Sequence, residues 1–378
     1  MNDHGRRALE ILEELGRRPA APFHEGGPAR YLAAFARNLG VDVQVDSFGN
    51  VIAHYRKGSG EDRPPVAYVA HMDHPGYEIA EIRDGDAVVR ALGGVPAASL
   101  RKQVPVQVLM PDGSRPRGEL TPPDAPLSDD PSERLTLLQI EAGAALEPGL
   151  LVVFDLPDFE LDGDYIRMRA LDDLAGCAAT AAALERLVHE SADADLYAVF
   201  TRAEEGGLFG ARLLAEAGTL PLDTLVVSIE SSPVIQGVAQ GDGPVIRTGD
   251  AMYTFDAEAE QILAVAVETI RERDPDFRFQ RRLMSGGSCE GTAFAVFGYR
   301  ATGLAFPLVN HHNATTSIPD PDGDIGAETI ALTDFLGGVE LLAEAATAAN
   351  RIDDSPVRQR IRHTPDDVRM RLEGSVRW

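Results

Sequence analysis

The chain of 378 residues is long enough for two domains, and its hydrophobic content of 44% is that of a globular protein. A formal net charge of −25 at pH 7 argues against nucleic acid and anionic membranes as partners, because both repel an acidic surface. A high-salt or GC-rich source would produce the same acidity. The sequence contains no apolar run of about 18 residues, so we expect no membrane span.

The first segment, residues 1–18, is predicted to form an amphipathic helix, because apolar residues recur on one helical face at Ala8, Ile11, Leu12 and Leu15. This pattern differs from a signal peptide, which needs an uninterrupted apolar core and a small-residue cleavage site. The only cysteines are Cys177 and Cys289, too few for a disulfide framework. We therefore expect a protein of the reducing cytoplasm.

Helical and strand patterns alternate up to residue 76. A second helix is predicted over 26–40, because apolar residues share one face and Gly40 ends the pattern. A strand is predicted after it at 41–46, from the alternation of apolar and polar residues, and further strands are predicted at 50–55 and at the mostly apolar run 66–71.

The pattern changes between about residues 77 and 165. Short alternating strands occur there, with hairpin signals at 83–86 and 110–116, and no helical pattern is present. The proline-rich and acidic stretch 121–133 is predicted to be a mobile loop. This stretch is typical of a small barrel-like β domain inserted into a larger one.

Helices and strands alternate again from about residue 173. Helices are predicted at 173–189, 207–218, 259–273 and 328–349, and strands at 196–201 and 224–230. The fold class is therefore α/β, a mixed central sheet with helices on both faces, plus the inserted all-β domain. The predicted domain boundaries are 1–76 and 166–350 for the two parts of the α/β domain, 77–165 for the insert, and 351–378 for a charged tail.

Acidic and histidine side chains gather where the predicted strands of the α/β domain end. In open α/β sheets, ligands bind beyond the carboxyl ends of the strands, so side chains at these ends are candidates for a shared site. Five such ends carry a histidine or a carboxylate, namely His71 and Asp73; Asp172 and Asp173; Glu204 and Glu205; Glu230; and His311 and His312.

A metal centre explains this collection. Imidazole and carboxylate are ligands of Zn²⁺ and similar divalent ions, whereas clustered carboxylates without a cation repel one another. Two ions that share one carboxylate need about six donor atoms. Five residues, with one bridging and one bidentate carboxylate, supply them: His71, Asp172, Glu205, Glu230 and His312. We expect two divalent ions, zinc first, with cobalt and manganese as alternatives.

The same segments resemble the tetrahedral aminopeptidases, a family of co-catalytic zinc exopeptidases that includes glutamyl aminopeptidases. The resemblance covers about residues 5–345. It is carried by the segments AHMDHPGY, ALDDLAGC, RAEEGGLFGA, VVSIE and LVNHHN in that order, by DSFGNVIAHY before them, and by the long insert after the first histidine.

The resemblance implies a role for each candidate ligand. His71 and Glu205 would each bind a metal ion, Asp172 would bridge the two ions, and the peptide bond after Asp172 would be cis. Glu230 would bind the second ion, where the family usually has the shorter Asp. His312 would complete the second site. It is preferred over His311 because consecutive strand residues face opposite sides and because it aligns better with the family's histidine.

Other residues of the motifs would act around the metals. Asp73 would orient the His71 imidazole through a hydrogen bond, and Glu204 would be the general base. His74, where the family commonly has Glu, is expected at the rim of the pocket, with an extra ligand as the alternative. Cys289 and Glu290 are candidates to line the substrate pocket.

The resemblance implies an aminopeptidase that removes N-terminal residues from peptides by means of a metal-bridging water. It also implies self-association, from a dimer up to a shell of twelve subunits assembled through the insert. The alternatives are a related di-metal carboxypeptidase, dipeptidase or N-acyl amino acid deacylase. The alternative from another class of function is a non-enzymatic protein that binds a metal or a peptide and has a decayed site. The histidines argue against an endoglucanase, which uses two carboxylates and no metal.

Overall fold

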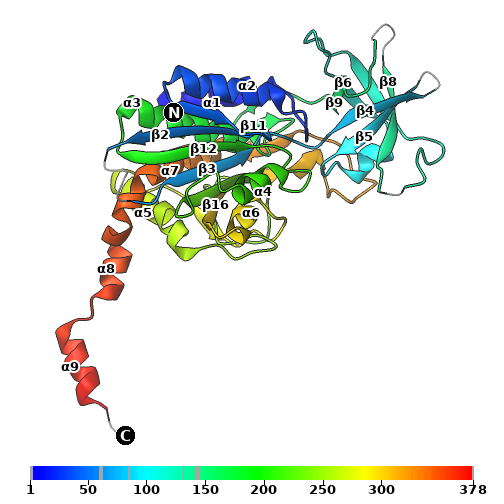
Figure 1. Cartoon of the computed structure of the whole chain (residues 1–378). Coiled ribbons are helices and arrows are strands. Elements are labelled where there is room, and N and C mark those ends of the chain that lie inside the picture. Colours follow the sequence, from blue (N-terminus) through cyan, green and yellow to red (C-terminus); the bar gives the residue numbers. More distant parts are fainter. Residues whose placement is uncertain (1–2, 59–62, 84–85, 131, 141–144, 377–378) are drawn as a thin grey trace.

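The computed structural model describes residues 3–58, 63–83, 86–130, 132–140 and 145–376. A large mixed sheet forms the centre of the molecule (Figure 1). Its strands are β1 (Asp42–Val45), β2 (Val51–Lys57), β3 (Val66–His71), β10 (Glu160–Asp162), β11 (Tyr165–Met168), β12 (Ala194–Thr201), β13 (Leu225–Pro233), β14 (Val245–Arg247), β15 (Gln280–Arg282), β16 (Arg300–Val309) and β17 (Glu328–Ala331).

Four parallel strands occupy the middle of this sheet. The main strand order is β1-β2-β12-β3-β13-β16-β17-β11-β10, and β12, β3, β13 and β16 run in the same direction. Their carboxyl ends therefore meet at one edge of the sheet, the edge where α/β proteins place their sites.

Alternating side chains of the strands build a core on each face. Tyr68 on β3 packs into the larger core with α1 (Asp3–Gly16), α2 (Gly26–Asn38), α3 (Leu174–Glu190), α5 (Ala257–Arg273) and α7 (Leu332–Ala348). Val69, the next residue, packs on the opposite face with α4 (Phe209–Glu216) and α6 (Glu290–Val296). The alternation follows from the two-residue period of a strand and confirms the predicted helix–sheet–helix layering.

A closed barrel lies beside one end of the sheet (Figure 1). Its strand order is β4-β5-β8-β7-β6-β9, and each neighbouring pair is antiparallel. The strands are β4 (Gly76–Arg83), β5 (Asp86–Leu92), β6 (Val104–Val108), β7 (Arg117–Thr121), β8 (Leu135–Ile140) and β9 (Leu151–Phe154), with the short helix η2 (Ala97–Leu100) between β5 and β6. The barrel has its own apolar core, as the all-β prediction required.

Two predicted boundaries differ from the structure. The insert was predicted to end at residue 165, but β10 and the first residue of β11, Tyr165, already belong to the central sheet, and the barrel strands end at Phe154. Residues 328–331, predicted as the start of a helix, form β17, and α7 begins only at Leu332. The predicted loop 121–133 connects β7 to β8, and the tip of the 83–86 hairpin lies outside the described residues.

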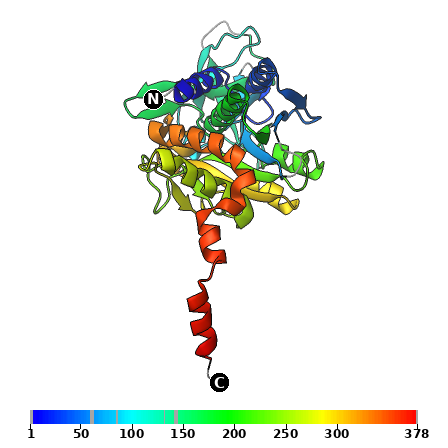
Figure 2. The same ribbon diagram turned by 90° about the vertical axis from the view of Figure 1, so that its left-hand side faces the viewer.

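The last segment leaves the body of the molecule. After α7 and η4 (Ala349–Asp354), the helices α8 (Pro356–Arg362) and α9 (Asp366–Gly374) project away from the sheet domain, on the side far from the barrel (Figures 1 and 2). A search of the described residues finds no helix with the length and hydropathy of a membrane span.

Candidate active site

The sheet edge brings the candidate residues together from distant parts of the chain. His71 is the last residue of β3, the Glu204–Glu205 turn follows β12, and Glu230 lies on β13. The pair His311–His312 follows β16 in the short helix η3 (His311–Asn313). Asp172 precedes α3 and faces the same point. Four groups of three potential ligands occur here, and within each group the donor atoms lie within 4.8 Å of one another.

His71 and Asp172 form the centre of the cluster. The Nε2 atom of His71 lies 3.3 Å from one carboxylate oxygen of Asp172 and 3.9 Å from oxygens of both Glu204 and Glu230. The second oxygen of Asp172 lies 3.2 Å from Nε2 of His311. Asp172 thus has one oxygen toward each half of the cluster, which is the geometry of a bridging ligand. The peptide bond between Asp172 and Asp173 is cis, as expected.

The second half of the cluster contains Glu205 and both histidines of the LVNHHN segment. Nε2 of His312 lies 3.0 Å from a carboxylate oxygen of Glu205, and its Nδ1 lies 2.9 Å from the carbonyl oxygen of Gly94. Of the two reasons for preferring His312 over His311, strand alternation was wrong, because both residues lie in the short helix η3 and not in a strand. Their rings stack with centroids 3.9 Å apart, so both imidazoles reach Asp172.

Asp73 acts on the backbone of the neighbouring turn. Its carboxylate accepts hydrogen bonds from the backbone N–H groups of Glu204 and Glu205, at 3.0 and 3.1 Å. The predicted contact between Asp73 and His71 uses the backbone instead: Nδ1 of His71 donates to the Asp73 carbonyl oxygen at 3.0 Å, whereas the Asp73 carboxylate is 3.8 Å away. Asp73 therefore positions two carboxylates and one imidazole at once.

Two more buried residues hold the same turn. Glu25 accepts a hydrogen bond from the backbone of Ala203 and pairs with Arg202 at 2.6 Å. Asn50, the last residue of the D-x-x-G-N segment, accepts from the backbone of Arg202 and donates to the carbonyl of Gly210. Through these contacts the DSFGN segment positions the turn of Glu204 and Glu205, although it does not contact the cluster itself.

The cluster is electrostatically unfavourable without a cation. Burial and the carboxylates of Glu205 and Glu290 raise the pKa of Glu204 well above its usual range. Burial and the carboxylates of Glu290 and Glu204 do the same to the pKa of Glu230. Burial lowers the pKa of His71, but the nearby carboxylates outweigh it and raise this pKa well above 6.5. A divalent ion would relieve this repulsion.

Several carboxylate oxygens that could bind a metal ion make no hydrogen bond of regular geometry within the described part of the chain. One buried oxygen of Glu230 has no partner there, and the corresponding oxygens of Asp172 and Glu205 lie only beside imidazole nitrogens, 3.3 Å from Nε2 of His71 and 3.0 Å from Nε2 of His312. A buried carboxylate oxygen normally has a partner, because leaving it unpaired costs about 1–3 kcal/mol or more for a charged group. Buried carboxylate oxygens gathered with imidazole nitrogens fit a bound metal ion, so the residues present suit the centre that was predicted.

Glu328 was missed by the sequence analysis. This fully buried residue of β17 accepts hydrogen bonds from the backbone N–H groups of Leu171, Asp172 and His312, at 2.7, 2.9 and 2.9 Å. It thereby joins the loop of the central carboxylate to the turn of the histidines. The signal in the sequence was a glutamate directly before an apolar run, which we interpreted as the start of a helix.

Three expectations about neighbouring residues were wrong. His74 is not at the rim, because it is only 3% exposed and its nitrogens contact the carbonyl of Asp172 and the side chain of Asn313. Cys289 and Glu290 are fully buried and do not line the pocket. Glu290 lies behind the site, where its carboxylate accepts from Thr201 and Ser228.

A pocket of about 320 Å³ opens over the cluster. Glu204, Glu205 and Glu230 contribute to its wall, together with the segment 286–288. The same wall contains Arg247 of β14, which is 2% exposed and whose Nε and Nη1 atoms have no hydrogen-bond partner among the described residues. Arg247 was not predicted from the sequence. The indication available there was an arginine directly after the apolar residues PVI.

Comparison with known proteins agrees with this geometry. The model of the M42 glutamyl aminopeptidase family matches residues 49–322, which is more than half of the chain. The chain belongs to the M42 family. It is therefore a peptidase of the aminopeptidase class, as the resemblance predicted.

Individual relatives cover most of the chain. A curated relative from Acetivibrio thermocellus is 27% identical over 320 residues, 80% of this chain and 88% of that protein. An aminopeptidase from the archaeon Desulfurococcus kamchatkensis is 25% identical with a TM-score of 0.74, over 93% of this chain and 98% of that one. The TET1 peptidase of Pyrococcus horikoshii is 26% identical with a TM-score of 0.71, over 90% and 99%.

Removal of Glu328 is expected to loosen the site and destabilise the fold. In Glu328→Ala, three buried N–H groups lose their acceptor, so we expect the free energy of unfolding to fall by about 2–4 kcal/mol. Chemical denaturation measures it, with Glu216→Ala, an exposed glutamate at the end of α4, as a control that changes it by less than about 0.5 kcal/mol. Equal stability of the two variants would contradict the positioning role.

Proposed function

We propose that the protein is a di-metal aminopeptidase. The observation that carries this proposal is the convergence of imidazole nitrogens and buried carboxylate oxygens at one sheet edge, where the atoms within each group of three lie within 4.8 Å of one another. The proposed ligands are the predicted five, His71, Asp172, Glu205, Glu230 and His312. His311, whose Nε2 lies 3.2 Å from Asp172, is the alternative to His312. Zinc is the first candidate for both ions, because its ligands in proteins are imidazole and carboxylate.

The proposed chemistry is hydrolysis of the N-terminal peptide bond. Two bound divalent ions would lower the pKa of a water molecule and polarise the scissile carbonyl. Glu204 would take the proton of the attacking water and deliver it to the leaving amine. Its position supports this role, because the Asp73 carboxylate fixes its backbone and its own carboxylate points at His71, 3.9 Å from Nε2.

The alternatives from the sequence are less well supported. Family membership favours an aminopeptidase over a carboxypeptidase, a dipeptidase or an N-acyl amino acid deacylase. A non-enzymatic protein with a decayed site is not supported either, since every proposed ligand and the proposed base face the cluster. The TET1 peptidase of Pyrococcus horikoshii is described as able to assemble into a tetrahedron or a large octahedral shell, and the similar structure of PhTET1-12s is described as a dodecamer. We infer that this chain also self-associates.

Arg247 supports a preference for an acidic N-terminal residue. Its guanidinium is buried in the pocket wall, and two of its nitrogens have no partner in the described part of the chain. A buried arginine stays charged, and its planar group matches a carboxylate through two parallel hydrogen bonds. The side chain of an N-terminal Glu or Asp would supply that carboxylate.

Changes to the ligands are expected to remove metal. Asp172→Ala should lose both ions, because Asp172 faces both halves of the cluster, whereas His71→Ala should lose mainly one. Elemental analysis of the dialysed proteins measures the number of ions per chain. Wild-type stoichiometry in both variants would rule out these ligand assignments.

If Glu204 is the general base, its substitution should affect turnover but not metal binding. Glu204→Gln should keep both ions, yet kcat should fall by about 10²–10⁴-fold, since the amide cannot accept the proton. Hydrolysis of an amino-acyl anilide and metal analysis on the same sample measure both quantities. If the variant turns over at the wild-type rate, the base is another group.

The specificity assignment predicts a change in selectivity at constant metal content. In Arg247→Met we expect the ratio of kcat/KM for glutamyl over leucyl anilide to fall by about a hundredfold or more, because a carboxylate would enter the pocket unpaired. Arg247→Lys should lose part of this ratio, since it keeps the charge but not the paired hydrogen bonds. An unchanged ratio in Arg247→Met would refute the acidic preference and leave the aminopeptidase proposal standing.

A further inference from the structure

The C-terminal arm, residues 356–376 with α8 and α9, exposes apolar side chains that have no cover in the described structure. Ile361 is 73% exposed and Leu372 is 62% exposed, and each has an exposed valine four residues before it, Val357 and Val368. Pairs four residues apart lie on the same helix face. Helix α9 has no buried residue at all. Apolar faces of this kind on a projecting helix indicate a contact surface.

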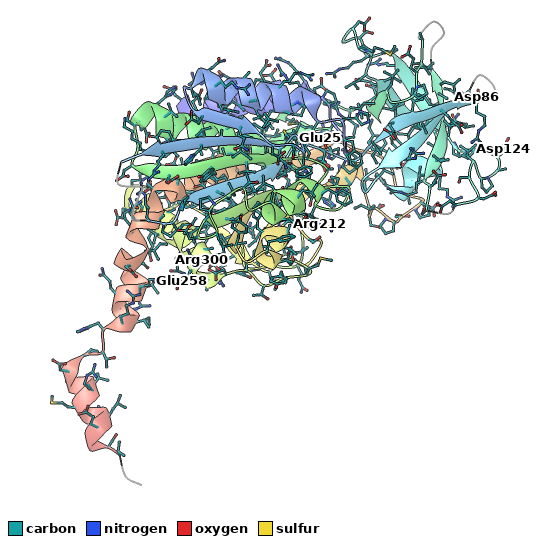
Figure 3. All side chains as sticks on the ribbon, in the orientation of Figure 1. Glu25, Asp86, Asp124, Arg212, Glu258 and Arg300 are labelled. Atoms are coloured by element: carbon teal, nitrogen blue, oxygen red, sulfur yellow. The ribbon has the colours of Figure 1, made fainter. Side chains whose placement is uncertain are left out.

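The arm differs in charge from the rest of the molecule. Residues 357–378 contain six arginines and three acidic residues, whereas the whole chain carries a net charge of −25. Arg358 and Arg362 are engaged at the root of the arm: Arg358 pairs with Glu258 of α5, which is labelled in Figure 3, and both arginines pair with Asp353. Arg360, Arg369 and Arg371 have no ion-pair partner among the described residues.

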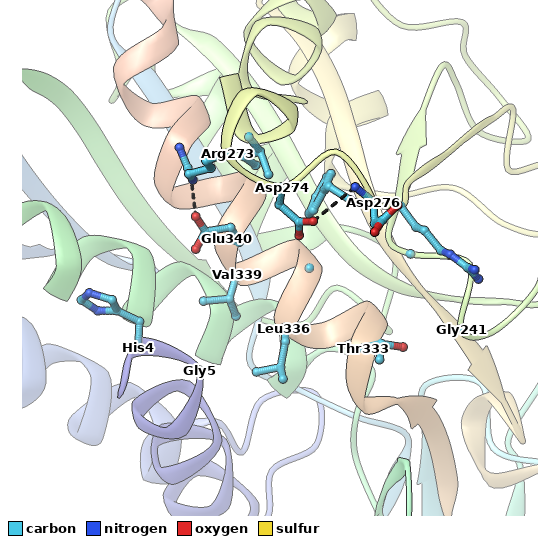
Figure 4. A pocket seen from close by; sticks show the side chains of 15 residues that line it. His4, Gly5, Gly241, Arg273, Asp274, Asp276, Thr333, Leu336, Val339 and Glu340 are labelled. Carbon is cyan, nitrogen blue, oxygen red and sulfur yellow. Dashed lines mark hydrogen bonds and ion pairs between the residues drawn. The ribbon is translucent and has the colours of Figure 1, made fainter. Parts of the chain in front are cut away.

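A groove of complementary character lies on the body, between α1, α5 and α7 (Figure 4). It has a volume of about 660 Å³, and Phe277, Leu336 and Val339 supply apolar surface. The loop after α5 adds Asp274 and Asp276 at its border; both are exposed, and neither pairs with a basic side chain in the described part of the chain. Arg273 and Arg278 also line the groove, but they pair with Glu340 and Asp242. The groove therefore offers apolar contact together with the negative charge of Asp274 and Asp276.

We propose that the arm of one subunit docks in this groove on a second copy of the chain. The arm points away from its own body in both views, so it is free to reach another molecule (Figures 1 and 2). Its charge requires an acidic partner, and the body of a second copy is acidic. DNA and anionic membranes would attract the arm but repel the body that carries it. This inference rests on the proposed self-association and assigns one contact within it.

The contact combines two interactions. Ile361 and Leu372 would leave water against the apolar groove, and Arg360, Arg369 and Arg371 would face Asp274 and Asp276. Exchange of arms across a two-fold axis would use each arm and each groove once, which is the commonest closed arrangement of identical subunits. The charged part of the contact would weaken in high salt, because salt screens exposed charges.

Light scattering after size-exclusion chromatography of the full chain tests the proposal. Reversal of the arm charges (Arg360→Glu, Arg369→Glu, Arg371→Glu) should lower the mass of the assembly by about twofold or more, since the contact joins pairs. Reversal of the groove charges (Asp274→Lys, Asp276→Lys) should do the same. The two sets combined should recover the wild-type mass. The matched control Arg30→Glu, Arg37→Glu, Arg101→Glu makes the same change in net charge outside the arm and should keep that mass.

Retained hydrolysis of an amino-acyl anilide and a single cooperative thermal transition would show that each variant is folded. Ile361→Asp with Leu372→Asp tests the apolar half in the same way. Wild-type mass in both arm variants would overturn the proposal while self-association stands, and failure of the combined variant to reassemble would overturn the groove assignment. A monomeric wild type would overturn both the docking of the arm and the inferred self-association. The same holds for a monomeric wild type that binds anionic vesicles or DNA through the arm.

Discussion

Mutual repulsion among buried carboxylates at one sheet edge is the constraint on which this structure depends. Asp172, the Glu204–Glu205 turn and Glu230 come from three separate segments, and their carboxylates meet around a single imidazole, that of His71. Burial makes such a cluster costly, since ionised carboxylates require solvent or a cation. The fold accepts this cost because the parallel strands end at the same edge and a metal centre can compensate the charge.

A layer of buried polar residues behind the cluster gives it its shape. Asp73 and Glu25 fix the turn that carries Glu204 and Glu205, through backbone N–H groups. Glu328 ties the loop of Asp172 to the histidine turn in the same manner. These residues act on the main chain, so the ligand carboxylates and the Nε2 atoms of His71 and His312 are left to face the cluster. Free donor atoms are what a metal ion requires, and the supporting layer makes them available without loss of order.

Much of the fold and the set of clustered residues could be predicted from the sequence. Strand ends are readable, because apolar runs such as VAYVAH stop at polar residues and parallel strands collect those residues at one edge. The supporting layer was harder to find. Glu328 precedes an apolar run that continues directly into α7, so the four residues of β17 look like helix. His74 and Glu290 are polar residues whose burial arises only from tertiary packing, which a local pattern cannot reveal.

The central claim is that the cluster holds two cations bridged by Asp172. Crystals of the metal-loaded protein, with anomalous scattering recorded at the absorption edge of the bound metal, test it most directly. The account predicts two peaks about 3.5–4 Å apart, one on each side of the Asp172 carboxylate. A single peak, or peaks away from Asp172, would contradict it.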